Sequence, residues 1–234
     1  MLTPKRIYEE ELLDAGAGTD DDVAETLSDL RRINRYLGGT GIVIKSLDKI
    51  LGKERPKEIS LLDVGTGSAD IPEAVVEWCR SRGIKPRVVA LDISERNLRV
   101  ARARLGFNPD ITLVCADSLN LPFAQSSFDI VTASLFLHHF VEDDVVRMLR
   151  SFSGLGRRAV IVNDLVRNLI PYYFMRIAGP IITTSYLSRN DGPVSVLRGF
   201  TASELHGLAR RAGFGRIDLK QKFPYRLSMV ARLE

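Results

Sequence analysis

The sequence predicts an α/β fold: a Rossmann-like, doubly wound, mostly parallel sheet in a single domain. The first observation is the stretch ISLLDVGTGSAD from Ile59 to Asp70, in which an apolar run ends in a Gly-x-Gly turn. A short apolar run bounded by glycines is typical of a buried parallel strand, and Pro72 is tolerated in the first turn of the helix that follows. The second observation is that apolar strands and helices alternate after this unit, which favours a parallel sheet with right-handed crossovers. The third is size, because 234 residues are enough for one large α/β domain (1–234) with its own core.

Residues 1–55 are expected to form a helical cap before the first strand. From Asp20 to Leu37, apolar side chains recur at steps of three and four residues, and Gly38 with Gly39 ends that helix. Residues 40–51 give a second apolar helical segment, and residues 53–57 form a charged linker.

The core is expected in two pieces, residues 56–164 and 200–234, which hold seven strands. Ser94 can cap one helix, and Thr201 with Glu204 forms a capping box for the last one. After the strand that begins at Ile59, the expected elements are a helix at 71–82, a strand at 87–91, a helix at 94–105, strands at 111–116 and 128–133, a helix at 142–152, a strand at 158–163, a helix at 203–212 and strands at about 216–222 and 227–233.

Residues 165–199 interrupt this alternation after the fifth strand. The segment combines aromatic and small residues and contains Asn190-Asp191-Gly192-Pro193, which predicts a turn. An insertion of this size at a strand end is typical of a lid or a pocket wall.

Carboxylates follow three of the predicted strands and surround the glycine turn. Asp63 lies within the first strand, and Asp92 and Asp117 end the next two, so all three reach one edge of a parallel sheet. Asp70 stands at the helix start, where a dinucleotide fingerprint would place glycine or alanine beside a pyrophosphate. Because a carboxylate repels phosphate, the expected ligand carries hydroxyls, amines or a positive charge.

Four stretches together resemble a known family: LLDVGTGSAD, VVALDIS, VCADSLNLPFAQSSFDIV and SLFLHHF, spaced from about Ile59 to Asp164. They are similar to the class I S-adenosylmethionine-dependent methyltransferases, in particular to the small-molecule branch of ubiquinone/menaquinone-biosynthesis type. The resemblance implies one antiparallel strand closing the sheet, S-adenosyl-L-methionine as cofactor and S-adenosyl-L-homocysteine as product. Many members carry glycine where this chain has Ala69, which is tolerable if the φ of that residue is negative.

The resemblance and the strand-end positions together suggest roles for the cofactor residues. Asp92 is placed to accept both ribose hydroxyls, and Asp117 with Ser118 resembles the contact to the adenine amine. Asp63 either holds the loop amides and the ligand ammonium or serves loop architecture alone. Ser134 is placed for the methionine end. The full expected cofactor set is Asp63, Gly65, Thr66, Gly67, Asp92, Ile93, Asp117, Ser118, Leu119 and Ser134.

The acceptor pocket is expected to lie under residues 165–199 and the N-terminal helices, which would form a mobile cover. Its candidate binding residues are Phe136, Tyr172, Tyr173, Arg176 and Arg189. Candidates for a general base are His138, His139, Asp164 and Tyr172. Of the adjacent histidines, one is expected to be a packed structural residue and the other remains a possible base. No metal is expected, since a sulfonium needs no metal activation and no second ligand pair is spaced for one.

Three functions remain open from the sequence. The first is methyl transfer to an oxygen or carbon of a small, apolar or aromatic metabolite. The second, an RNA or protein methyltransferase, is disfavoured because the position after the fourth strand has Ser134-Leu-Phe-Leu137 instead of an Asn/Asp-Pro-Pro-aromatic tetrad. The third is a non-catalytic S-adenosylmethionine-binding protein or a nicotinamide enzyme of similar fold, and Asp70 argues against the nicotinamide enzyme.

The composition points to a cytoplasmic protein with a small-molecule partner. A net charge of +4 is spread over helix faces, so no nucleic-acid partner is expected. Cys79 and Cys115 are expected to be buried thiols, which suits a reducing compartment. The acidic first thirty residues lack a secretory signal, and the apolar stretch 169–182 is interrupted by Pro171, Arg176 and Pro180, so no membrane insertion is expected.

Overall fold

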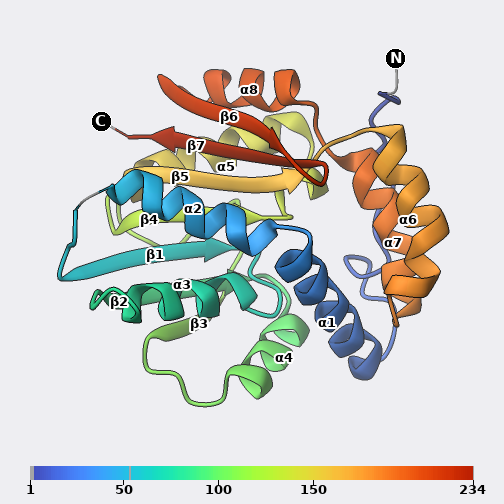
Figure 1. The fold of residues 1–234 in the computed structure, drawn as a ribbon, viewed down its shortest axis with the longest axis horizontal. Coiled ribbons are helices and arrows are strands. Elements are labelled where there is room, and N and C mark those ends of the chain that lie inside the picture. Colours follow the sequence, from blue (N-terminus) through green and yellow to red (C-terminus); the bar gives the residue numbers. More distant parts are fainter. Residues whose placement is uncertain (1–2, 53, 234) are drawn as a thin grey trace.

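The computed structural model describes residues 3–52 and 54–233 and shows one seven-stranded sheet with helices on both faces (Figure 1). The strand order is β3-β2-β1-β4-β5-β7-β6, and in the described chain β7 runs antiparallel to the other strands. The expected doubly wound sheet with one antiparallel strand is therefore confirmed. The strands are β1 (Glu58–Val64), β2 (Lys85–Asp92), β3 (Ile111–Cys115), β4 (Phe128–Ser134), β5 (Gly156–Leu165), β6 (Arg216–Lys222) and β7 (Arg226–Arg232).

The helices fall into those that cover the sheet and those beyond its carboxyl edge. They are α1 (Asp20–Tyr36), α2 (Gly39–Leu51), α3 (Asp70–Arg80), α4 (Glu95–Leu105), the 3-10 turn η1 (Leu137–His139), α5 (Glu142–Leu155), α6 (Leu169–Ile182), α7 (Tyr186–Arg198) and α8 (Ala202–Arg211). Apolar side chains of α2 and α3 pack on one face of the sheet, and those of α5 and α8 pack on the other. This double cover explains why β1 is buried at every residue after Glu58.

The cap and the insertion form one cover at the carboxyl edge of the sheet, where α1, α6 and α7 lie together in Figure 1. Helix α1 packs against α2, α4 and α7, and α6 packs against α7. The buried carboxylate of Asp29 in α1 accepts hydrogen bonds from the backbone N–H groups of Thr184 (2.9 Å) and Ser185 (3.0 Å). The mobility of this cover stays a prediction.

Two local expectations about chain conformation are wrong. Residues 3–18 contain no helix, because the first helix begins only at the capping box of Thr19 and Asp22. The Asn190–Pro193 stretch lies inside α7 instead of in a turn. The carboxylate of Asp191 accepts from the backbone N–H groups of Leu12 (2.9 Å) and Leu13 (3.1 Å), so a tertiary contact with the N-terminal segment overrides the local signal.

Two single-residue expectations also differ from the structure. Cys79 is buried as expected, but Cys115 is exposed at the end of β3, which is an edge strand of the sheet. Ala69 has φ +58°, so the negative φ set as the condition for tolerating alanine is not met, and the residue lies in the left-handed region. Within the described ranges, no helix is both long and apolar enough to cross a membrane.

Candidate functional site

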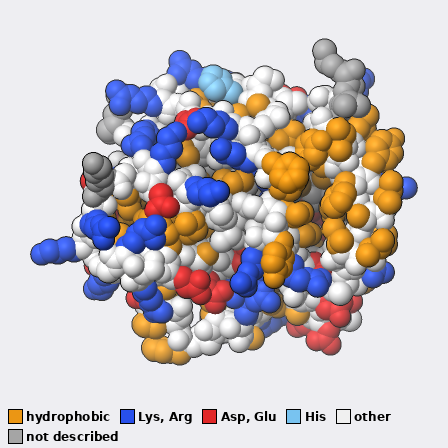
Figure 2. All heavy atoms as spheres, in the orientation of Figure 1, with side chains coloured by type: hydrophobic (Ala, Val, Ile, Leu, Met, Phe, Trp, Pro, Cys, Tyr) orange, Lys and Arg blue, Asp and Glu red, His pale blue; other side chains and the backbone are white. Residues whose placement is uncertain are grey.

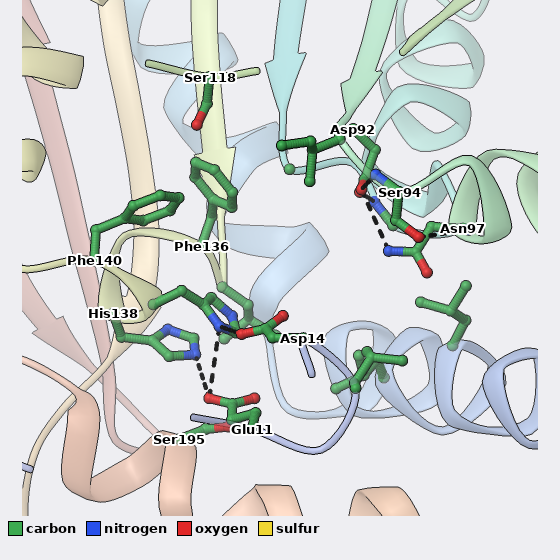
Figure 3. A pocket seen from close by; sticks show the side chains of 18 of the residues that line it. Glu11, Asp14, Asp92, Ser94, Asn97, Ser118, Phe136, His138, Phe140 and Ser195 are labelled. Atoms are coloured by element: carbon green, nitrogen blue, oxygen red, sulfur yellow. Dashed lines mark hydrogen bonds and ion pairs between the residues drawn. The ribbon is translucent and has the colours of Figure 1, made fainter. Parts of the chain in front are cut away.

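A cavity of about 460 Å³ opens at the carboxyl edge of the sheet, beneath α1 and α7 (Figure 3). Its floor consists of the glycine turn after β1 and the ends of β2 and β3, and one wall is the segment 135–140 after β4. The other wall comes from residues 11–16 and from α7. Ligands of open parallel sheets bind in this place because the loops leaving the strand ends diverge there.

The glycine turn is shaped to bring backbone and aromatic ring close together. Gly65 has φ +71°, and a Cβ on it would lie 2.1 Å from the ring of Phe136. Gly67 has φ +52°, and its backbone N–H donates to Oδ2 of Asp92 at 2.8 Å. Both glycines and Phe136 line the cavity, so the turn and the segment after β4 are fitted to one another at its floor.

We expect Gly65→Ala to weaken binding of S-adenosylhomocysteine by at least about tenfold, because the added methyl group must displace Phe136 and strain a left-handed backbone. Calorimetric titration of the purified variant measures this. Gly207→Ala is the matched control, since nothing lies within 4 Å of a Cβ at that helical glycine. Unchanged affinity in Gly65→Ala would contradict the fit between the turn and the ring.

Asp63 and Thr66 support the turn from below and do not line the cavity. The buried carboxylate of Asp63 accepts hydrogen bonds from the hydroxyls of Thr66 (2.7 Å) and Thr132 (2.6 Å). Burial raises the pKa of Asp63 to about 7, against the lowering effect of these two hydrogen bonds. This geometry favours the architectural alternative for Asp63.

Asp92 combines a structural role with exposure of its carboxylate to the cavity. Its Oδ1 accepts from the backbone N–H of Ser94 (2.9 Å) and from Nδ2 of Asn97 (3.3 Å), as Figure 3 shows for Asn97. Only 7% of the residue is exposed, and burial raises its pKa although these donors lower it. A carboxylate has about four acceptor sites. The N–H groups of Ser94 and Asn97 use Oδ1 and that of Gly67 uses Oδ2, so Oδ2 of Asp92 can still accept from a ligand hydroxyl.

Six of the ten expected cofactor residues line this cavity. They are Gly65, Gly67, Asp92, Ile93, Asp117 and Ser118. Ile93 is 70% exposed at the rim, and Asp117 is fixed by the backbone N–H of Leu119 at 2.8 Å. Leu119 itself does not line the cavity, and neither does Ser134, whose hydroxyl accepts from Nδ2 of Asn163 at 2.6 Å.

The residues present fit the cofactor that the resemblance implies. Carboxylates at Asp92 and Asp117 offer acceptors for ribose hydroxyls and an adenine amine, and the rim at Ile93 is apolar. The missing Cβ at Gly65 lets the ring of Phe136 pack against the turn, so an aromatic face lies beside the acidic strand ends in the cavity lining. The carboxylates of Asp92 and Asp117 place negative charge at this floor, which agrees with a ligand without phosphate.

His138 is a structural histidine held between two buried acids. It is 2% exposed, its Nδ1 donates to Oδ1 of Asp164 at 2.6 Å, and its Nε2 lies 3.6 Å from Oε1 of Glu11. Burial lowers the pKa of His138, but the charges and hydrogen bonds of Asp164 and Glu11 outweigh it and raise the pKa to about 9. An imidazolium that keeps its proton at neutral pH is no general base.

His139 makes the second half of this cluster and lies against the cavity. Its Nδ1 donates to Oδ2 of Asp14 at 2.6 Å, which leaves Nε2 with the lone pair. The side chains of Glu11, His138 and His139 bring three possible metal-ligand atoms within 4.8 Å of one another. A protonated His138 has no lone pair for a metal, so ion pairing with Glu11 accounts for this cluster.

The structure places one of the five expected acceptor-binding residues in the cavity lining and the other four outside it. Phe136 lines the cavity, but Tyr172, Tyr173, Arg176 and Arg189 do not. Tyr173 instead belongs to the exposed apolar surface over α6 that is prominent in Figure 2. The insertion reaches the cavity through other residues: Leu165, Met175, Gly192, Ser195 and Val196.

Sequence reasoning also missed Glu11, Asp14 and Arg226, which all line the cavity. The two acids lie in a segment expected to be helical, and Arg226 begins a strand expected only for closure of the sheet. Paired acids at a three-residue step in an otherwise unassigned segment were the one available signal for Glu11 and Asp14.

Comparison with known proteins gives a consistent result. Residues 61–157 match a family described as a methyltransferase domain. The chain is 32% identical over 192 residues to demethylmenaquinone methyltransferase of Paenarthrobacter aurescens (78% of this chain, 70% of the relative). It is 29% identical over 170 residues to the ubiquinone/menaquinone biosynthesis C-methyltransferase UbiE of Azotobacter vinelandii (67% and 66%). The match thus spans about two thirds of the length of these relatives.

A solved structure shows the same fold. Human N-acetylserotonin methyltransferase, solved in complex with S-adenosylmethionine, superposes with a TM-score of 0.67 at 13% identity (98% of this chain, 63% of that chain). At this identity the likeness concerns the fold alone.

Proposed function

Since the chain belongs to the S-adenosylmethionine-dependent methyltransferases, we propose that it methylates a hydroxylated aromatic ring, at a ring carbon or at the hydroxyl oxygen. The cofactor is S-adenosyl-L-methionine, whose positive sulfur supplies an activated methyl group. The observation that carries the acceptor proposal is that the His139–Asp14 pair faces the same cavity as Asp92.

The cavity offers two chemically different ends. Asp92, Asp117 and Ser118 lie at the end formed by β2 and β3, where they would accept from the ribose hydroxyls and the adenine amine. The segment after β4 and the insertion form the other end, where apolar side chains lie beside the His139–Asp14 pair: Phe136, Phe140, Leu165, Met175 and Val196. An apolar, aromatic-lined wall suits a flat ring. The name of the 32% identical relative supports a quinone-type ring as the acceptor.

His139 would remove the proton from the acceptor hydroxyl. Its Nε2 accepts the proton, while Asp14 holds Nδ1–H and stabilises the charge that develops on the imidazole. The phenolate electron pair, on oxygen or on the ring carbon ortho or para to it, would then take the methyl group while its bond to the cofactor's sulfur breaks and that electron pair stays on sulfur as a neutral thioether. On carbon, the ring proton would then pass to water, which restores aromaticity. The remaining task of the chain is alignment and exclusion of water, which the cover of α1 and α7 would serve.

The cover is proposed to move during the cycle, since 165–199 and the N-terminal cap close over the acceptor end. Met175, Gly192 and Ser195 reach the cavity from this insertion, so opening of α6 and α7 would give an acceptor access. Methylation of RNA or protein is not favoured, because Ser134-Leu-Phe-Leu137 lacks the Asn/Asp-Pro-Pro-aromatic tetrad that grips a planar amine.

The function can be tested with purified protein, S-adenosylmethionine and a demethylmenaquinol analogue with a shortened side chain, kept reduced. We expect a product heavier by one methyl group, whose position mass spectrometry and NMR assign to carbon or oxygen. A quinone that stays oxidised is the matched control, since it has no hydroxyl proton to give up. If neither this ring nor simple dihydroxynaphthalenes are methylated while S-adenosylhomocysteine binds, the proposed acceptor class is wrong.

A further inference from the structure

Arg226 is a buried arginine that lines the cavity and belongs to no role assigned above. It is the first residue of β7 and pairs with Leu165 of β5, so the antiparallel direction of β7 places it at the carboxyl edge of the sheet. Only 1% of the residue is exposed. It nevertheless contributes to the wall of the cavity.

Both terminal nitrogens of Arg226, Nη1 and Nη2, are buried and have no hydrogen-bond partner among residues 3–52 and 54–233. Two other buried arginines donate hydrogen bonds from all three guanidinium nitrogens, so burial alone does not leave an arginine without partners in this protein. Arg167 donates to the carbonyls of Pro4 and Gly199 and to Glu204. Arg198 donates to the carbonyls of Glu9, His138 and His139. A buried polar group without a partner is costly, so Arg226 calls for a partner from outside the chain.

The guanidinium of Arg226 is also charged, and the nearby carboxylates accept no hydrogen bond from its terminal nitrogens in the described chain. Burial lowers the pKa of Arg226 to about 10, while the charges of Asp164 and Asp70 oppose this shift, so the group stays protonated at neutral pH. Asp164 is already bound by His138 and by the backbone N–H of Leu165. Asp70 accepts from Nδ2 of Asn34 at 3.1 Å. The positive charge facing the cavity is therefore available for an anionic ligand.

We propose that Arg226 binds a carboxylate inside this cavity, through its two free N–H edges. A planar guanidinium matches a carboxylate in a bidentate way, and such a pair satisfies both nitrogens at once. The carboxylate of the methionine part of the cofactor is the first source, because two buried amide oxygens without a partner among the described residues belong to residues next to the lining, although neither residue lines the cavity, and they offer acceptors for the adjoining ammonium group. These are Oδ1 of Asn34 and Oδ1 of Asn163, both buried without a partner in the described chain. Asn34 contacts Asp70, and Asn163 pairs with Ser228, two residues along β7 from Arg226.

The second source would be a carboxylate on the acceptor ring.

The proposal for Arg226 rests on the protein's use of S-adenosylmethionine and does not depend on which ring is methylated. Its failure is therefore distinguishable from failure of the proposed function, since binding of cofactor fragments is measured without any acceptor.

The test compares S-adenosylhomocysteine with 5′-methylthioadenosine, which lacks the amino-acid part, by calorimetry on the wild type and on Arg226→Met. If the cofactor supplies the carboxylate, the variant should lose about 10- to 100-fold in affinity for S-adenosylhomocysteine and none for 5′-methylthioadenosine. Arg226→Lys should recover part of this affinity, because it restores the charge without the bidentate geometry. If Arg226→Met does not fold, Arg226→Lys alone must show the selective loss.

A second arm addresses the acceptor. With S-adenosylhomocysteine saturating, 1-hydroxy-2-naphthoate and 1-naphthol are titrated into both proteins. Selective loss of naphthoate binding in Arg226→Met assigns the carboxylate to the acceptor. Unchanged affinity of the variant for S-adenosylhomocysteine and for naphthoate overturns the proposal. Arg189→Met is the matched control, since this arginine is exposed and does not line the cavity.

Discussion

His139→Ala should lower kcat by about 10²–10⁴-fold and leave the affinity for S-adenosylhomocysteine nearly unchanged. The imidazole faces the cavity but lies in the wall after β4, whereas the residues proposed for ribose and adenine follow β2 and β3. Loss of the imidazole therefore removes proton transfer without removing cofactor contacts. Methyl transfer to a reduced naphthoquinol, measured under saturating cofactor, gives kcat, and calorimetry gives the affinity.

Three comparisons make this result specific. Asp14→Asn should lower kcat by less than His139→Ala, because it weakens the orientation of the ring and keeps the base. Imidazole added to the buffer should restore part of the activity of His139→Ala. His206→Ala should have no effect, since His206 is exposed on α8. Wild-type kcat in His139→Ala would show that the acceptor loses its proton without this base.

The sheet could be predicted from the sequence because its signals are local and repeated. The apolar runs of β1, β2 and β4, the Gly-x-Gly turn and the capping box at Thr201 each fix an element within a few residues. The same holds for the floor of the site: Gly65, Gly67, Asp92 and Asp117 follow strand ends, and strand ends in a parallel sheet meet at one edge.

The walls of the site could not be predicted in this way, since they depend on contacts between distant segments. Glu11 and Asp14 reach the histidines from a non-helical segment held by Asp191 of α7. Tyr172 and Tyr173 are aromatic, as an acceptor pocket requires, yet neither lines the cavity. Their ring centroids lie 5.1 Å apart, and it is Met175 of the same helix that reaches the cavity. Which face of a helix meets the cavity is decided by packing of α6 on α7, and periodicity within α6 does not carry that information.

The roles of the two adjacent histidines also depend on a contact between distant segments. Their sequence position alone left open which of them is structural. The buried partner Asp164 distinguishes them, because it comes from the end of β5 and its carboxylate accepts from the ring of His138, whereas the ring of His139 donates to Asp14. One histidine thus anchors the segment after β4, and its neighbour is left to face the ligand.

Asp164→Asn should destabilise the protein by about 3–5 kcal/mol at pH 7, because it leaves the charged His138 buried without its closest counter-ion. Burial raises the pKa of Asp164, but the charge and hydrogen bond of His138 outweigh it and lower the pKa, so the pair is ionised at neutral pH. Denaturant unfolding followed by circular dichroism measures the loss. Asp143→Asn is the matched control: its partner Arg211 is exposed, so this change should cost less than about 1 kcal/mol.

The effect of Asp164→Asn on stability should depend on pH in a definite direction, whereas a packing defect would not depend on pH. The pKa of His138 is raised from its usual value of 6.5 to about 9 in the folded state, so the folded protein keeps a proton that the unfolded chain releases between these values. The stabilisation is therefore complete below pH 6.5 and is lost as the pH rises toward 9. Wild-type stability should fall over this range, and the difference between wild type and Asp164→Asn should shrink, because the imidazole no longer needs its counter-ion. His206→Gln is the control and should leave the fall in stability with pH as it is in the wild type. A stability difference between Asp164→Asn and wild type that stays constant from pH 6.5 to 9 would contradict the prediction. It would show that the carboxylate acts through packing and not through the charge of His138.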